Sequence, residues 1–122
     1  MLLRDFYTID QLAVSEEGKL EAHVTLNTNH EIYNGHFPGQ PILPGVCLIE
    51  MVRGIVAGHL QQSLFFQGAD QIKFMNIVDP QLTDHLTFKL SLEEQDGAYQ
   101  VHNEARAGEI TCFKMKGTFL AE

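Results

Sequence analysis

Hydrophobic and polar residues alternate along several stretches of this chain. The alternation is regular over Lys19–Asn27 and strict over Leu86–Leu92, while Gln71–Val78 is a shorter apolar stretch. Side chains of a β-strand point to opposite faces in turn, so a period of two is typical of a half-buried strand. The pattern therefore predicts strands in all three stretches.

Two tight turns divide the last third of the chain. Asp96-Gly97 is a typical two-residue hairpin turn, and Ala107-Gly108-Glu109 has the composition of a second one. These turns delimit strand candidates at Ala98–Ala107 and Ile110–Leu120. The second half is thus predicted to be an antiparallel meander.

From Pro44 to about Gln62 the pattern changes to a run that is apolar nearly all round, with Glu50, Arg53 and His59 as its strongly polar members. Pro44 suits the first turn of a helix. A helix that is apolar on every face is expected to be buried on every face. We therefore expect an α+β hotdog fold, in which a curved antiparallel sheet wraps around one long central buried helix.

Composition narrows the classes of protein. At 122 residues with 44% hydrophobic residues, the chain fits a single domain over 1–122. The net charge of −8 argues against nucleic-acid binding, and no apolar run approaches the length of a membrane span. Charge begins at Arg4, too early for a signal peptide, so we expect a cytoplasmic protein without membrane insertion. Cys47 and Cys112 form no CxxC pair and are expected to be small buried residues.

The loop before the predicted helix carries the candidate chemistry. His36 begins a segment in which prolines and glycines fix the backbone path, Gly45 opens the helix, and Glu50 lies roughly 7 Å further along its axis. An imidazole accepts a proton near neutral pH, helix-start amides stabilise a developing oxyanion, and a desolvated carboxyl donates a proton. Together they suit removal of a proton next to a carbonyl with loss of a β-hydroxyl.

The segment His36-Phe37-Pro38-Gly39-x-Pro41-x-x-Pro44-Gly45-Val46 resembles the signature of the 3-hydroxyacyl-[acyl-carrier-protein] dehydratases, and Glu50 stands fourteen positions after His36, where that family has its acidic residue. A looser likeness covers most of the chain, including Ile72-Lys73-Phe74 and Asp84-x-Leu86. The resemblance implies that His36 takes the α-proton and that Glu50 protonates the leaving hydroxyl.

The resemblance also implies how the substrate is held. The amide of Gly45, helped by that of Val46, would bind the thioester carbonyl, and Phe37, Pro38 and Gly39 would complete the substrate site. No cofactor or metal is implied. The substrate would be attached to the 4'-phosphopantetheine of an acyl carrier protein. The active sites would lie at the interface of a homodimer, with a trimer of dimers left open.

Alternatives remain for these residues. His36 could serve only local backbone groups. Arg53, three residues after Glu50, could form an ion pair that keeps the carboxylate charged and opposes its work as an acid. His30, Glu31 and His36 lie close in sequence, but their spacing matches no established metal-binding pattern.

The function has alternatives too. A hotdog thioesterase would hydrolyse the same thioester bond, and an acyl-binding module would bind without turnover. The run Glu50-Met51-Val52-Arg53-Gly54 departs from the family, in which a small residue follows the acid and a glutamine stands four positions after it. The departure leaves open a specialised pathway, such as polyene or aryl-lipid synthesis. An acidic carrier would need cations gathered near its docking site, and the candidates are Arg53, Lys73, Arg106, Lys114 and Lys116.

Overall fold

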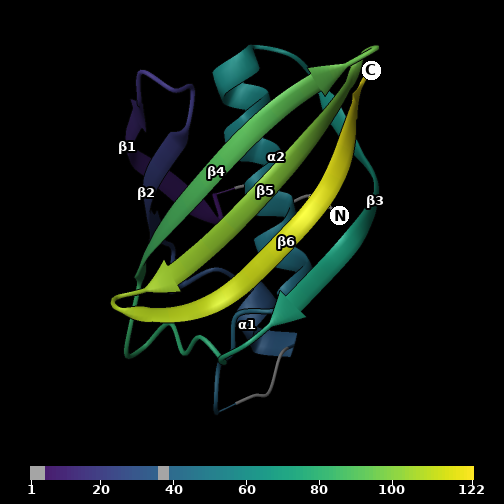
Figure 1. Ribbon diagram of the computed structural model, residues 1–122. Coiled ribbons are helices and arrows are strands. Elements are labelled where there is room, and N and C mark those ends of the chain that lie inside the picture. Colours follow the sequence, from purple (N-terminus) through teal and green to yellow (C-terminus); the bar gives the residue numbers. More distant parts are fainter. Residues whose placement is uncertain (1–4, 36–38) are drawn as a thin grey trace.

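One antiparallel sheet curves around one long helix in the computed structural model, which describes residues 5–35 and 39–122 (Figure 1). The strands are ordered β1-β2-β4-β5-β6-β3 across the sheet, so β1 and β3 are its two edges. In chain order the elements are β1 (Tyr7–Val14), β2 (Leu20–Leu26), α1 (Ile32–Gly35), α2 (Gly45–Leu60), β3 (Leu64–Phe74), β4 (His85–Gln95), β5 (Ala98–Ala107) and β6 (Ile110–Ala121). The predicted α+β arrangement of a central helix and a curved sheet is confirmed.

The sheet has an inner face against α2 and an outer face that carries the polar residues. In β2 every second residue is buried, and β4 pairs with it so that Leu86 lies opposite Val24 and Phe88 opposite Ala22. Directly opposed residues point to the same face. The alternation in the sequence therefore assigns one face of each strand to the core, as predicted.

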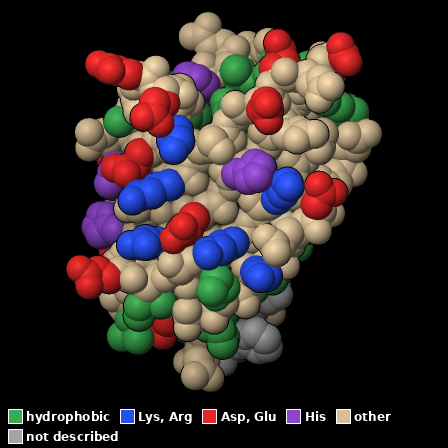
Figure 2. Space-filling view, viewed as in Figure 1, with side chains coloured by type: hydrophobic (Ala, Val, Ile, Leu, Met, Phe, Trp, Pro, Cys, Tyr) green, Lys and Arg blue, Asp and Glu red, His purple; other side chains and the backbone are tan. Residues whose placement is uncertain are grey.

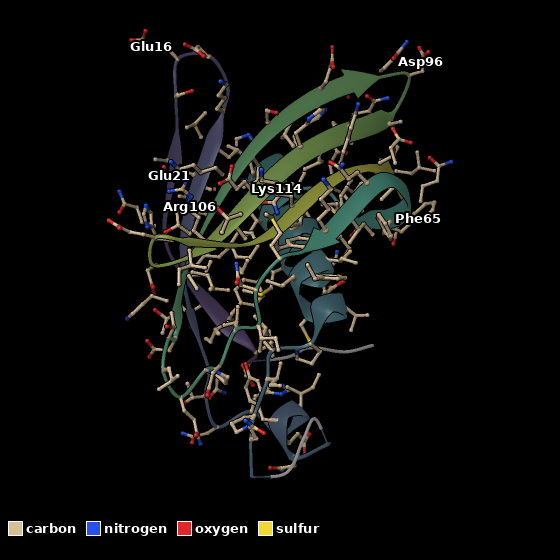
Figure 3. The ribbon with its side chains drawn as sticks, turned by 60° about the horizontal axis from the view of Figure 1, so that its bottom comes forward. Glu16, Glu21, Phe65, Asp96, Arg106 and Lys114 are labelled. Atoms are coloured by element: carbon tan, nitrogen blue, oxygen red, sulfur yellow. The ribbon has the colours of Figure 1, made fainter. Side chains whose placement is uncertain are left out.

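The hairpins of the second half also follow the prediction. Gln95 pairs with Ala98, and the residues between them, Asp96 and Gly97, have φ angles of 53° and 81°. Two positive φ angles in succession match the right-handed twist of the flanking strands, which is why Asp-Gly is favoured in such turns. Figure 3 shows Asp96 at the tip of the β4–β5 hairpin.

Both edge strands differ from the prediction. β1 was not expected, and β3 extends from Leu64 to Phe74 where a strand over Gln71–Val78 was predicted. The pairing of β1 with β2 slips between Ile9 and Gln11, and that of β3 with β6 slips twice. Each β-bulge inserts one extra residue, so the inward-facing residues change from odd to even positions or the reverse. The alternation with a period of two is then no longer visible in the sequence. The short helix α1 was not predicted either.

The central helix is buried along one stripe and not on every face. Pro44 is its N-cap, one position before the first turn in which it was expected, and Gln61 ends it with a left-handed φ of 55°. The buried residues are Cys47, Leu48, Met51, Val52, Ile55 and Val56. The opposite stripe, which includes Val46, Glu50 and Arg53, is only partly covered by this chain.

Across the described ranges, none of the helices has the length and apolar character needed to cross a bilayer.

Candidate active site

An apolar groove of about 540 Å³ lies at the start of α2. The first turns of the helix form one side of it, and the end of β3 with the residues that follow forms the other. Its lining residues are Ile42, Leu43, Gly45, Val46, Leu48, Ile49, Phe74, Met75, Asn76, Ile77 and Val78. A groove of this size and character suits a small organic ligand.

Gly45 is required by the close approach of Phe74 to the helix. A Cβ atom at Gly45 would lie 2.6 Å from the Phe74 ring, closer than side-chain atoms normally come. The Phe74 ring also stacks on Phe113, with a centroid distance of 5.4 Å. Gly45 thus allows an aromatic wall to stand directly against the start of the helix.

The main chain at this position can bind an oxyanion. The first N–H groups of a helix have no partner within the helix, and the helix dipole is positive at this end. Gly45 and Val46 are the first two residues of α2, and both line the groove. The loop before them is anchored because the N–H of Leu43 donates to the Val78 carbonyl over 2.9 Å. A carbonyl oxygen placed here would meet fixed donors as charge develops on it.

Glu50 is bound by Arg53. The Arg53 Nε donates to both carboxylate oxygens, over 2.9 Å and 3.0 Å, and Nη2 donates to Oε1 as well. The Arg53 Nη1 also donates to the Leu64 carbonyl over 3.3 Å, which fixes the guanidinium against β3. Both side chains are 31% exposed. The ion pair that the sequence offered as an alternative role for Glu50 is therefore present.

The charge of Glu50 also shifts the pKa values of neighbouring groups. Burial and then the charge of Glu50 raise the pKa of Tyr7, and the same two causes raise the pKa of Cys47 to about 11. The hydrogen bond to Glu50 raises the pKa of Arg53. Cys47 and Cys112 are buried and free, as expected. With its pKa raised, Cys47 is a poor candidate for a reactive thiol.

The predicted site residues fall into three groups. Gly45 and Val46 line the groove, whereas Glu50 lies one turn beyond Val46 and is not among the residues that line it. His36, Phe37 and Pro38 lie outside the described residues. Gly39 is exposed, with a φ of 83°, and is not part of the groove lining.

Known proteins resemble this chain over most of its length. A family model described as ApeI-like, ApeI dehydratase, matches residues 12–112. The chain belongs to the ApeI-like dehydratase family.

Curated relatives of this ApeI-like chain include the 3-hydroxyacyl-[acyl-carrier-protein] dehydratases FabZ of Bacillus licheniformis and Caldicellulosiruptor bescii. Each is 32% identical over 120 residues, which cover 88% of this chain and 80% and 82% of the respective relatives. The resemblance to that dehydratase family is therefore confirmed.

Solved structures share the fold of this member of the ApeI-like family. The dehydratase heterocomplex ApeI:P from Xenorhabdus doucetiae has a TM-score of 0.77 at 20% identity, with 93% of this chain and 96% of the other covered. An uncharacterised protein from Erwinia carotovora subsp. atroseptica has a TM-score of 0.64 at 21% identity, with 94% and 92% covered. These likenesses confirm the predicted hotdog fold.

The surroundings of Glu50 include a residue that sequence reasoning missed. Tyr7, at the start of the unpredicted strand β1, packs so closely on α2 that a Cβ atom at Gly54 would lie 2.4 Å from its hydroxyl oxygen. Gly54 is one of the positions at which the chain departs from the family pattern. This departure was the signal in the sequence that another side chain packs against α2 here. The ApeI-like helix thus combines Arg53 and Gly54 with a tyrosine from the sheet edge.

Proposed function

We propose that this protein dehydrates a 3-hydroxyacyl thioester, carried by an acyl carrier protein, to the trans-2-enoyl thioester in fatty-acid or related lipid or polyene biosynthesis. The observation that carries the proposal is the apolar groove at the start of α2, which Gly45 and Val46 line. It supplies an apolar wall for an acyl chain and main-chain donors for a thioester oxygen. The FabZ relatives and the ApeI-like family support the reaction class.

The proposed elimination uses one base, one acid and one set of donors. His36 removes the α-proton, and the electrons of the C–H bond form the new double bond as the β-carbon–oxygen bond breaks. Glu50 gives a proton to the departing hydroxyl, which leaves as water. The Gly45 amide, helped by that of Val46, stabilises the negative charge on the thioester oxygen.

Arg53 adds a condition to the role of Glu50. A carboxylate that accepts hydrogen bonds through both oxygens has no proton to give. Glu50 must therefore exchange the guanidinium for the substrate hydroxyl and take up a proton before it acts as the acid. In the proposed cycle, this exchange accompanies substrate binding.

We propose that His36 and Glu50 of one site come from different copies of the chain in a homodimer. Within one chain, Glu50 lies outside the groove lining, on the partly covered stripe of α2. Around the groove, Val46 is 56% exposed and Phe74 is 55% exposed. A second copy that covers these apolar side chains would bring its own catalytic groups to the groove.

Turnover of matched substrates tests the proposed reaction. The purified chain is incubated with 3-hydroxyacyl carrier protein and with crotonyl carrier protein, while enoyl absorbance and free thiol are followed together. Reversible interconversion without thiol release supports the dehydratase, and a Glu50→Gln variant that folds normally should lose at least about a hundredfold in rate.

The other outcomes identify the alternatives. Release of thiol would identify a thioesterase, and tight binding without reaction would identify an acyl-binding module. Sedimentation of the purified chain supplies the second readout. A monomer that turns over as fast as any larger species would contradict the shared site.

A further inference from the structure

The positive charges of this acidic chain gather on one face. The chain has 16 acidic and 8 basic residues, and Arg53 pairs with Glu50 on the helix. The other Lys and Arg side chains of residues 5–35 and 39–122 are carried by the outer face of the sheet or its rim. These residues are Lys19, Lys73, Lys89, Arg106, Lys114 and Lys116. Figure 2 shows the gathering over the sheet, on the side away from α2.

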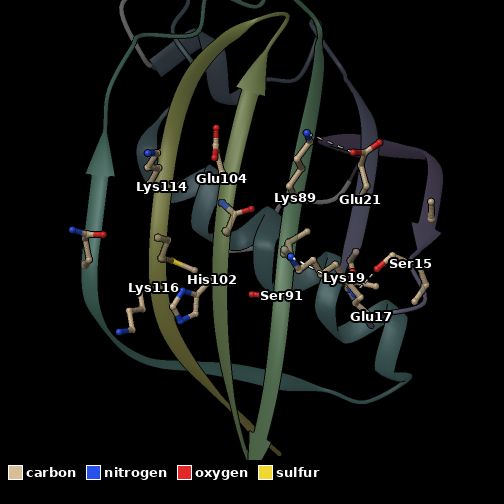
Figure 4. A pocket seen from close by; sticks show the side chains of 17 residues that line it. Ser15, Glu17, Lys19, Glu21, Lys89, Ser91, His102, Glu104, Lys114 and Lys116 are labelled. Carbon is tan, nitrogen blue, oxygen red and sulfur yellow. Dashed lines mark hydrogen bonds and ion pairs between the residues drawn. The ribbon is translucent and has the colours of Figure 1, made fainter.

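Three of these cations are already paired with carboxylates. Lys19 lies 3.7 Å from Glu17, Lys89 lies 3.9 Å from Glu21, and the Arg106 Nε donates to Glu104 over 3.1 Å. Figures 3 and 4 show Glu21 on β2, and Figure 4 marks the ion pair from Lys89 to it. These pairs leave little local charge.

The remaining three form what we call the lysine cluster: Lys73, Lys114 and Lys116. Lys73 is directly opposite Lys114 across the β3–β6 ladder, and Lys116 follows two positions later on the same face, opposite His102 of β5. On its other side Lys114 is opposite Glu104 of β5, whose carboxylate accepts hydrogen bonds from Arg106 and Thr111. In the part of the chain that the structure describes, none of the three lysines has a carboxylate oxygen within 4.0 Å. Like charges directly opposite each other destabilise a sheet. In a chain rich in carboxylates, this arrangement suits an anion supplied by another molecule.

One member of the lysine cluster is the sequence neighbour of a residue that lines the groove. Lys73 is followed by Phe74, which ends β3 and forms the aromatic wall of the groove. Lys73 and Phe74 point to opposite faces of the sheet, as their partners Lys114 and Phe113 do. A ligand whose anionic part lies on the cluster therefore reaches the groove around the end of β3.

The surface around the cluster is broad and shallow. Lys114, Lys116 and His102 line one side of a depression of about 890 Å³, which extends across the outer face to Lys89 and Glu21 (Figure 4). Such a surface fits the face of a folded partner better than a small molecule alone. The net charge of −8 repels an acidic partner from the rest of the chain. The lysine cluster would therefore also determine the orientation in which that partner binds.

We propose that the lysine cluster docks the acyl carrier protein, with carboxylates of the carrier and the phosphate of its prosthetic arm against Lys73, Lys114 and Lys116. This inference rests on the proposed function and adds the docking surface to it. The thioester arm then runs from the cluster around the end of β3 to Gly45.

Charge reversal with a matched control tests the docking. The variant K114E/K116E is compared with K19E/K89E, which makes the same change in net charge at the far side of the same depression. Because Lys19 and Lys89 already have carboxylate partners, the control is expected to have the smaller effect. Each protein is assayed with one acyl group on the carrier protein and on pantetheine. We expect K114E/K116E to raise KM for the carrier substrate by roughly tenfold or more at low salt, with KM for the pantetheine substrate unchanged. Added salt should narrow this difference.

Direct titration keeps docking separate from turnover. Binding of holo-carrier protein to each variant is measured with folding checked by circular dichroism, and Kd should rise more for K114E/K116E than for K19E/K89E. Equal effects of the two double variants, equal effects on both substrates, or an unchanged Kd would overturn the docking proposal. A wild-type protein that binds the carrier through the cluster but dehydrates neither substrate would instead contradict the proposed function.

Discussion

A double-mutant cycle on Glu50 and Arg53 measures how firmly the ion pair holds the proposed acid. The variants are Glu50→Gln, Arg53→Met and the double variant. Fully exposed ion pairs contribute about 0.2–1 kcal/mol, whereas breaking a buried pair costs about 3–5 kcal/mol. Both side chains are 31% exposed, and Arg53 contacts both carboxylate oxygens. We therefore expect a coupling free energy of about 1–2 kcal/mol. The bond from Arg53 to the Leu64 carbonyl is lost in both legs that contain Arg53→Met, so it cancels from the coupling.

The free energy of unfolding is measured for each variant by urea denaturation with far-ultraviolet circular dichroism at pH 7. Protein concentration is held fixed, since subunit assembly would couple to stability. Lys89 and Glu21 supply the control cycle, because they are 3.9 Å apart and 56% and 44% exposed, and their coupling should stay below about 0.5 kcal/mol. A Glu50–Arg53 coupling as small as this control would refute the claim that Arg53 restrains the carboxylate.

Turnover measurements then distinguish the roles of the two residues. Glu50→Gln should abolish dehydration, while Arg53→Met should keep kcat within about tenfold of wild type.

The remaining predictions concern the core, the outer face and the groove. Asn103 is 6% exposed, and its amide nitrogen and oxygen have no partner among the described residues. Asn103→Leu should therefore stabilise the fold by about 1–3 kcal/mol, and a lower thermal midpoint would contradict this. Hydrogen bonding from Arg106 lowers the pKa of Glu104, so this carboxylate stabilises the fold above its unfolded pKa, and that contribution is lost as pH falls through the folded pKa. The stability difference between wild type and Glu104→Gln should therefore shrink in acid, and a constant difference in urea midpoints would argue against the assignment. Gly45→Ala should push the Phe74 ring into the groove and raise KM while the fold stays intact. Gly58→Ala is the control: a Cβ there would have nothing within 4 Å, so it should stabilise α2 by about 0.5–1 kcal/mol without changing KM. Equal KM values for the two variants would exclude this role of Gly45.

Sequence patterns predicted the parts of the fold in which the ladder is regular. The strands β2, β4, β5 and β6 follow from alternation and from the turn residues between them. β1 and the first half of β3 escaped because bulges shift the parity of their apolar residues. The partly covered stripe of α2 could not be read from a helix that is apolar nearly all round, because hydrophobicity alone does not say which face the rest of the chain covers.

The candidate site was predictable where one short segment contains its residues. Gly45 and Val46 follow from the proline- and glycine-rich loop, and the pairing of Glu50 with Arg53 follows from helix spacing. Tyr7 was missed because only the pairing of β1 within the sheet brings it to the helix; Gly54 marked the place on α2 but not the residue that fills it. Lys114 and Lys116 stand two positions apart in the predicted strand Ile110–Leu120, which is enough to put them on one face. Their meeting with Lys73 depends on the register between β3 and β6.

Complementation between the His36 and Glu50 variants tests the proposed shared active site most directly. His36→Ala and Glu50→Gln are each purified, mixed in equal amounts under conditions that exchange subunits, and assayed with the 3-hydroxyacyl carrier substrate. Mixed dimers would contain one site with both residues intact, so the account predicts recovery of about a quarter of wild-type activity. No recovery, despite mixed dimers shown by mass spectrometry, would contradict a site built from His36 of one copy and Glu50 of the other.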